Sequence, residues 1–257
     1  MHKIIALYNY FSDKRYSTIA GTLVYFLLMS ITPFLFWLTL LAGNVDISKI
    51  ISHEIFAAVE PVVSYMQKSA ESAVGGAGIL LLATSLYSST NFFYHLRRSG
   101  EIIYGEKRRK GGIRLRLSSL GVIALIIIAV AAVAVITVIG YDYLTAFMPE
   151  NVVDIIVYTF VILISVGVAY LLNIFACPYK LEFEQAIAGS LLTTILWVIF
   201  AAGFTVYLNF ANPSRLYGKI AALIVFLLWC YLMTNSLVIG IIYNGMYLTE
   251  KKPKKLF

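Results

Sequence analysis

The sequence predicts an all-α membrane protein, a polytopic bundle of six transmembrane helices with short amphipathic helices at the membrane surface. Of its 257 residues, 60% are hydrophobic and only 13% are charged, whereas a soluble domain is about 25% charged. So little charge cannot cover a water-facing surface, but a lipid-facing surface needs none. The second observation is a set of six apolar runs, each free of charged residues and long enough to cross about 30 Å of hydrocarbon.

The six runs are predicted to be helices because each is about twice as long as a membrane strand and shows no apolar–polar alternation. The second run is the least apolar, since it contains several Gly, Ser and Thr residues. In chain order, the predicted spans are Gly21–Ala42, Val74–Tyr94, Ser118–Gly140, Ile155–Asn173, Ala186–Phe210 and Ile220–Tyr243.

The connections complete a single membrane domain over residues 1–257. Residues 1–19 carry apolar side chains at helical spacing, which predicts an amphipathic arm on the cytoplasmic surface. Residues 43–73 show the same spacing and predict an outer loop with short helices. Residues 96–117 are strongly basic and contain four glycines, which predicts a turn-rich cytoplasmic loop. Residues 246–257 form a basic cytoplasmic tail.

The distribution of positive charge predicts the orientation. Sixteen of the 20 lysine and arginine residues fall in the N-terminal arm, the connections after the second and fourth spans, and the tail. Basic residues accumulate on the cytoplasmic side of membrane proteins. With six spans, both termini are therefore expected on the cytoplasmic side.

The sequence offers little catalytic chemistry. The three histidines are scattered, and the motifs HExxH, GxxxxGK[ST], CxxC and GxSxG do not occur. No predicted span contains an ionisable carboxylate, amine or imidazole, although intramembrane hydrolases and proton-coupled carriers usually need such a group at depth. We therefore expect no enzymatic activity, no cofactor and no metal site.

Uncharged polar residues within and beside the spans are the better candidates for function. They either bond neighbouring helices, as buried asparagines in lipid commonly do, or line a polar pathway for a substrate. The residues are Ser30, Thr32, Pro33, Asn91, Asn173, Asn235 and Asn244.

The basic connection after the second span is expected to contact anionic lipid headgroups, each basic residue near the surface contributing about 1 kcal/mol. An RNA-binding surface would interleave aromatic residues with the cations, and here only Tyr104 is available for stacking. Nucleic acid is therefore not an expected partner, whereas membrane lipids are. The residues concerned are Lys107, Arg108, Arg109, Lys110, Arg114 and Arg116.

Several short motifs are spread over nearly the whole chain: Ala20–Tyr25 followed by Met29–Pro33, Asn91 with the basic segment after it, Cys177-Pro178-Tyr179, Ala186–Gly189 with Trp197, Leu216-Tyr217-Gly218, Leu228-Trp229, and Gly240 to Asn244. With these motifs the chain resembles the YihY/BrkB family of bacterial inner-membrane proteins, once labelled ribonuclease BN. The resemblance depends most on Tyr25, Pro178, Gly189, Tyr217, Gly218, Trp229 and Gly240.

One position departs from the family pattern. The family usually has a glutamate in its last helix where this chain has Ile242, so a mechanism through that carboxylate is not expected here. The ribonuclease label finds no support in these residues. The resemblance implies a transporter-like or lipid- and envelope-handling protein, with a non-transporting scaffold for protein partners as the alternative and a ribonuclease third.

Overall fold

The computed structural model describes residues 15–42, 84, 87–105, 112–179, 181–211 and 221–251. Most of the predicted arm, the outer loop and the end of the tail lie outside the described residues, as do Lys107, Arg108, Arg109, Lys110, Tyr217 and Gly218. The backbone at Thr32 and Pro33 is described, but their side chains are not.

Helices make up the described part, and no strand occurs in it. The elements are α2 (Tyr16–Ala42), α6 (Asn91–Tyr104), α7 (Gly112–Val135), the π-helical segment η2 (Ile136–Gly140), α8 (Tyr141–Thr145), α9 (Glu150–Ala176), α10 (Phe183–Ala211) and α12 (Ala221–Lys251). The predicted all-α membrane bundle is therefore confirmed.

Four stretches of the described chain are long and apolar enough to cross a membrane: Gly112–Val133, Glu150–Ala176, Phe183–Tyr207 and Ile224–Met246. They coincide with the third to sixth predicted spans. The first predicted span falls within α2, whereas most of the second lies outside the described residues. Six spans therefore remain a prediction.

Proline bounds α9 at both ends. Pro149 precedes its first residue with φ −59° and ψ 142°, and Glu150 places a negative charge in the first turn, where the helix dipole favours it. At the other end Cys177 is extended, with ψ 129°, as expected for a residue before proline, and Pro178 follows it. The chain thus turns sharply before α10 begins.

The prediction of a turn-rich loop at residues 96–117 is wrong over most of that range, because most of these residues are helical. Helix α6 continues to Tyr104 and ends at Gly105, which has φ +73°, and α7 already begins at Gly112. Gly100 lies inside α6, where an added Cβ would collide with the backbone carbonyl of Ala176 in α9. That glycine permits a close helix contact and does not form a turn.

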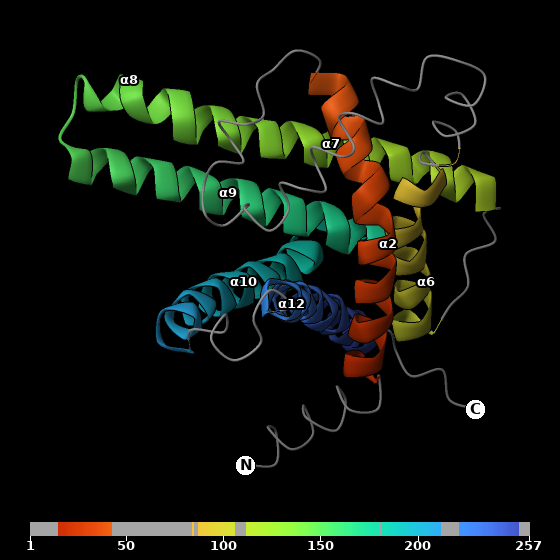
Figure 1. Cartoon of the computed structure of the whole chain (residues 1–257). Helices are drawn as coiled ribbons and strands as arrows, with labels where there is room; N and C mark the ends of the chain where they lie inside the picture. Colours follow the sequence, from red (N-terminus) through yellow and green to blue (C-terminus); the bar gives the residue numbers. More distant parts are fainter. Residues whose placement is uncertain are drawn as a thin grey trace, which may run out of the picture.

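Figure 1 shows how the helices are arranged. The continuous helix α7–η2–α8 and helix α9 form a long antiparallel pair, α2 and α6 lie side by side, and α10 and α12 cross below α9. The most extensive contact is between α10 and α12, and α12 also packs along α2. Helix α12 is therefore the central element of the described part.

The core lies where α2, α6, α9 and α12 meet, with Leu23, Leu96, Val238 and Ile241 almost completely buried. The outward faces of α7, α9 and α10 are also apolar, and large side chains such as Ile155 remain 66% exposed. A surface of this kind is typical of helices that contact lipid.

Candidate functional site: two polar junctions

The first polar cluster, which we call the asparagine junction, consists of Asn173, Gly189 and Asn244. The side chain of Asn244 on α12 is fully buried. Its Oδ1 accepts from the backbone N–H of Gly189 on α10 at 2.8 Å, and its Nδ2 donates to Oδ1 of Asn173 on α9 at 3.0 Å. Asn173 in turn donates to the carbonyl of Ala169 at 2.9 Å. One side-chain amide therefore connects three helices.

Two glycines make this junction possible. Gly189 on α10 faces Gly240 on α12, and an added Cβ on Gly189 would collide with the Gly240 carbonyl and with the Asn244 side chain. An added Cβ on Gly240 would meet the Thr193 hydroxyl and the carbonyl oxygen of Gly189. Small residues allow membrane helices to approach closely enough for such contacts. The hydrogen bonds of Asn244 are thus with neighbouring helices, whereas Asn173 bonds both Asn244 and its own helix.

Asn235, also on α12, differs from the other two asparagines. Its Oδ1 is buried and accepts no hydrogen bond within the described residues. A buried acceptor without a donor is costly in an apolar environment. Asn235 is therefore a place where a water molecule or a substrate group would gain a hydrogen bond.

The second polar cluster, the α2–α6–α7 junction, comprises Ser30, Tyr87, Thr90, Asn91 and Arg116. Ser30 on α2 is buried, donates to the Ser88 carbonyl at 3.0 Å and accepts from the backbone N–H of Phe92 at 3.1 Å. These two bonds fix α2 against the first residues of α6. They also satisfy one backbone N–H near the helix start, which would otherwise lack a partner.

Arg116 joins α7 to the same segment. Its Nη1 donates to Oγ1 of Thr90 at 2.9 Å, to Oδ1 of Asn91 at 3.2 Å and to the carbonyl of Tyr87 at 3.2 Å. Its guanidinium carbon lies 3.6 Å from the centre of the Tyr87 ring and 5.0 Å from that of Tyr94. Stacking on an aromatic face and hydrogen bonding together hold the cation in a defined plane.

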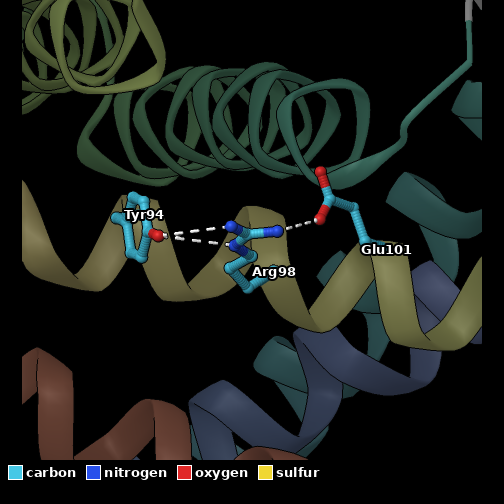
Figure 2. A network of polar contacts seen from close by, with 3 residues as sticks. All are labelled: Tyr94, Arg98 and Glu101. Atoms are coloured by element: carbon cyan, nitrogen blue, oxygen red, sulfur yellow. Dashed lines mark hydrogen bonds and ion pairs between the residues drawn. The ribbon is translucent and has the colours of Figure 1, made fainter. Parts of the chain in front are cut away.

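Figure 2 shows the adjoining network on α6, formed by Tyr94, Arg98 and Glu101. Nη1 of Arg98 forms an ion pair with Glu101 at 2.8 Å, and its Nε lies 3.4 Å from the Tyr94 hydroxyl, which accepts the bond. Hydrogen bonds to Tyr94 and to Glu101 raise the pKa of Arg98 above its ordinary value. The Arg98 charge is thus compensated within its own helix.

His95 stacks on Phe26 of α2, with ring centres 3.3 Å apart. Burial lowers the pKa of His95, and the positive charges of Arg116 and Arg98 lower it further. Both arginines are therefore close enough to act on the His95 ring.

Arg97 was expected only as a topology signal, and the structure gives it a different role. Its side chain is 5% exposed, and Nη1 donates to the carbonyls of Phe175 and Cys177 at the end of α9. The last carbonyls of a helix lack intrahelical donors, so a guanidinium there is stabilising. The sequence already indicated that Arg97 would be buried. Phe93, Leu96 and Gly100 lie on the same face of α6 as Arg97, at helical spacing.

The remaining motif residues are less clustered. Tyr25 is 55% exposed and Trp229 is 39% exposed, so neither belongs to the buried junctions. Trp197, in contrast, donates from its indole Nε1 to the Met233 carbonyl at 2.9 Å and adds a second link between α10 and α12. Within the described residues, no group of three His, Cys, Asp or Glu side chains is placed to bind a metal ion.

These observations define a multi-pass helical membrane protein whose buried polar groups meet at helix junctions. The chain belongs to the virulence factor BrkB family, because the family model matches residues 7–256. The resemblance drawn from the sequence motifs is thereby confirmed.

Individual relatives cover different shares of the chain. The ribonuclease-like protein YfkH of Bacillus subtilis (strain 168) is 25% identical over 249 residues, which is 91% of this chain and 90% of YfkH. A UPF0761 membrane protein of Xanthomonas oryzae pv. oryzae (strain PXO99A) is 43% identical over 63 residues, 24% of this chain and 15% of that protein. One of Coxiella burnetii (strain Dugway 5J108-111) is 31% identical over 68 residues, 26% of this chain and 24% of that protein. No solved structure matches the chain.

Proposed function

We propose that this BrkB-family membrane protein is transporter-like and moves or handles a lipid or another envelope component in the bacterial cytoplasmic membrane. The observation that carries the proposal is the α2–α6–α7 junction. Ser30 bonds the backbone of Ser88 and Phe92. Thr90 and Asn91 lie between those two residues in the sequence, and their side chains accept hydrogen bonds from Arg116. Polar and charged groups among membrane helices are costly, and they usually mark a substrate pathway.

A transport assay with matched variants tests this function. Purified protein is reconstituted into liposomes that contain a fluorescent phospholipid, and the movement of the lipid between leaflets is compared with that in empty liposomes. Asn91→Ala removes one acceptor of Arg116, whereas Thr22→Val changes an exposed hydroxyl of α2 that bonds only the Thr18 carbonyl of its own helix. We expect lipid movement with the native chain, slower movement with Asn91→Ala and no change with Thr22→Val.

The opposite result would favour the scaffold. If the native chain moves fluorescent lipids and small-molecule probes no faster than empty liposomes, the transporter proposal fails. If the native chain and Asn91→Ala, each used to capture binding partners, then bind the same envelope proteins, that result would support a non-transporting scaffold.

We further propose that both termini face the cytoplasm, which places the α6–α7 connection on the cytoplasmic side. The support is the excess of lysine and arginine in that connection and in the two terminal segments. A single cysteine introduced beside Lys107 should react with a membrane-impermeant maleimide only after the membrane is opened. Labelling of that cysteine in intact cells would show that the proposed orientation is wrong.

A further inference from the structure

Among the described residues, one hydrogen-bonding edge of Arg116 is free. A guanidinium carries five N–H donors in a planar fork, and a carboxylate or phosphate can accept two parallel bonds from one edge of it. All three hydrogen bonds of Arg116 come from Nη1. Within the described residues, the edge formed by Nε and Nη2 has no hydrogen-bond partner. Because Tyr87 holds the plane of the group, this edge is already oriented for a ligand.

The charge of Arg116 is also uncompensated in the described part of the chain. Its acceptors are the neutral oxygens of Tyr87, Thr90 and Asn91, whereas Arg98 forms an ion pair with Glu101. A partly buried cation without an anion is unfavourable, so a bound anion would stabilise it.

The position of Arg116 along α7 indicates where that anion comes from. The uncharged apolar stretch of α7 begins at Ser118, so at 1.5 Å per residue Arg116 lies about 3 Å before it. A basic residue directly before an apolar span is expected at the boundary between hydrocarbon and lipid headgroups. Arg114, two residues earlier on the same helix, is exposed and forms no hydrogen bond or ion pair within the described residues.

We propose that Arg116, held in plane by Tyr87, binds the phosphate of an anionic phospholipid headgroup through its Nε–Nη2 edge. The inference rests on the proposed lipid-handling function and deepens it, since it names the headgroup that the α2–α6–α7 junction recognises. Arg98 is already paired with Glu101, and Arg114 contributes only diffuse attraction.

Native mass spectrometry of the full chain in detergent tests the site without measuring transport. Phosphatidylglycerol and phosphatidylcholine are added separately, and the bound fraction is measured for the native chain, Arg116→Gln, Arg116→Lys and Arg114→Gln. The native chain should prefer phosphatidylglycerol. Arg116→Gln should weaken that binding by about tenfold, because two charge-assisted hydrogen bonds are lost. Arg116→Lys should recover only part of it, since an ammonium lacks the fork.

Arg114→Gln is the matched control, because it removes the same charge two residues away. In a detergent micelle there is no anionic membrane surface to attract this exposed residue, so the variant should change phosphatidylglycerol binding by less than about twofold. Equal losses in Arg114→Gln and Arg116→Gln would overturn the site in favour of diffuse electrostatics. Equal binding of the two lipids by the native chain would overturn it as well. If Arg116→Gln does not fold, Arg116→Lys tests the site instead, because it keeps the charge and loses the planar edge. Phosphatidylglycerol binding by Arg116→Lys that equals that of the native chain would then overturn the site.

A competition arm separates the possible sources of the phosphate. Inorganic phosphate at millimolar concentration should leave phosphatidylglycerol bound. Displacement of the lipid by inorganic phosphate would overturn the assignment to a lipid headgroup. A chain that binds phosphatidylglycerol through Arg116 but moves no lipid in liposomes would refute the proposed function and leave this inference intact.

Discussion

Replacing Gly189 by alanine tests whether the glycine contact between α10 and α12 holds the asparagine junction together. The added Cβ would collide with the Gly240 carbonyl and with the Asn244 side chain, whose Oδ1 accepts the Gly189 N–H. The Asn244 side chain can rotate away, but the Gly240 carbonyl belongs to the backbone. Relieving that collision therefore requires α10 and α12 to separate, and it breaks the bond between them.

The expected effect follows from three contributions. Overpacking a close contact costs about 1–3 kcal/mol. Loss of the Gly189–Asn244 and Asn173–Asn244 hydrogen bonds adds about 0.6 kcal/mol each in a membrane protein. Alanine gains up to about 1 kcal/mol over glycine in a helix. The net loss of unfolding free energy for Gly189→Ala is therefore about 2 kcal/mol.

Gly203→Ala is the matched control on the same helix. Gly203 is exposed, and an added Cβ there would have no neighbour within 4 Å. This variant should be neutral or more stable by up to about 1 kcal/mol. Unfolding of the purified chain in mixed micelles, followed by circular dichroism, measures both variants. If Gly189→Ala is as stable as Gly203→Ala, the reasoning about the close contact is refuted.

Four further predictions concern other parts of the molecule. Asn244→Ala should lower the unfolding free energy by about 1–2 kcal/mol in the same assay, because Asn173 loses its partner; a variant with native stability would contradict this. Arg97→Gln should cost about 1–3 kcal/mol, since the last carbonyls of α9 lose a charged donor, and hydrogen exchange at that end should rise; unchanged exchange there would count against the capping role. Purified protein should not cleave RNA, and cleavage that disappears on Arg108→Ala with Arg109→Ala would overturn this expectation. Transport by the native chain should not titrate with a group in α12, where Ile242 is fully buried; a pH dependence that mutation traces to this helix would disprove it.

The sequence by itself determined the fold class and four of the helices. Length and hydropathy are local properties, so four uncharged runs of sufficient length were enough to predict the helices that became α7, α9, α10 and α12. The fourth predicted span ended at Asn173, three residues before the observed end of α9 at Ala176, and Pro178 follows that end because proline cannot continue the hydrogen bonding of a helix. The family motifs were likewise readable without coordinates.

The extent of α6 could not be predicted in the same way. Four glycines and a high charge made residues 96–117 resemble a loop, because both features are unfavourable in an isolated helix. In the folded chain, Gly100 allows α6 to approach the backbone of α9, and Arg97 binds the carbonyls at the end of α9. Tertiary contacts therefore overrode the local preference.

Only the tertiary structure decided which polar residues meet. Asn173 and Asn244 are 71 positions apart, and Arg116 faces Tyr87 from a different helix. In a soluble helix an apolar stripe predicts the buried face, but the helices here are apolar on all sides because lipid and core are equally apolar. The rotation of each helix is then set by glycine contacts and by hydrogen bonds between helices. These contacts form only when the helices pack. The polar residues could therefore be identified from the sequence, whereas their partners depend on the packing.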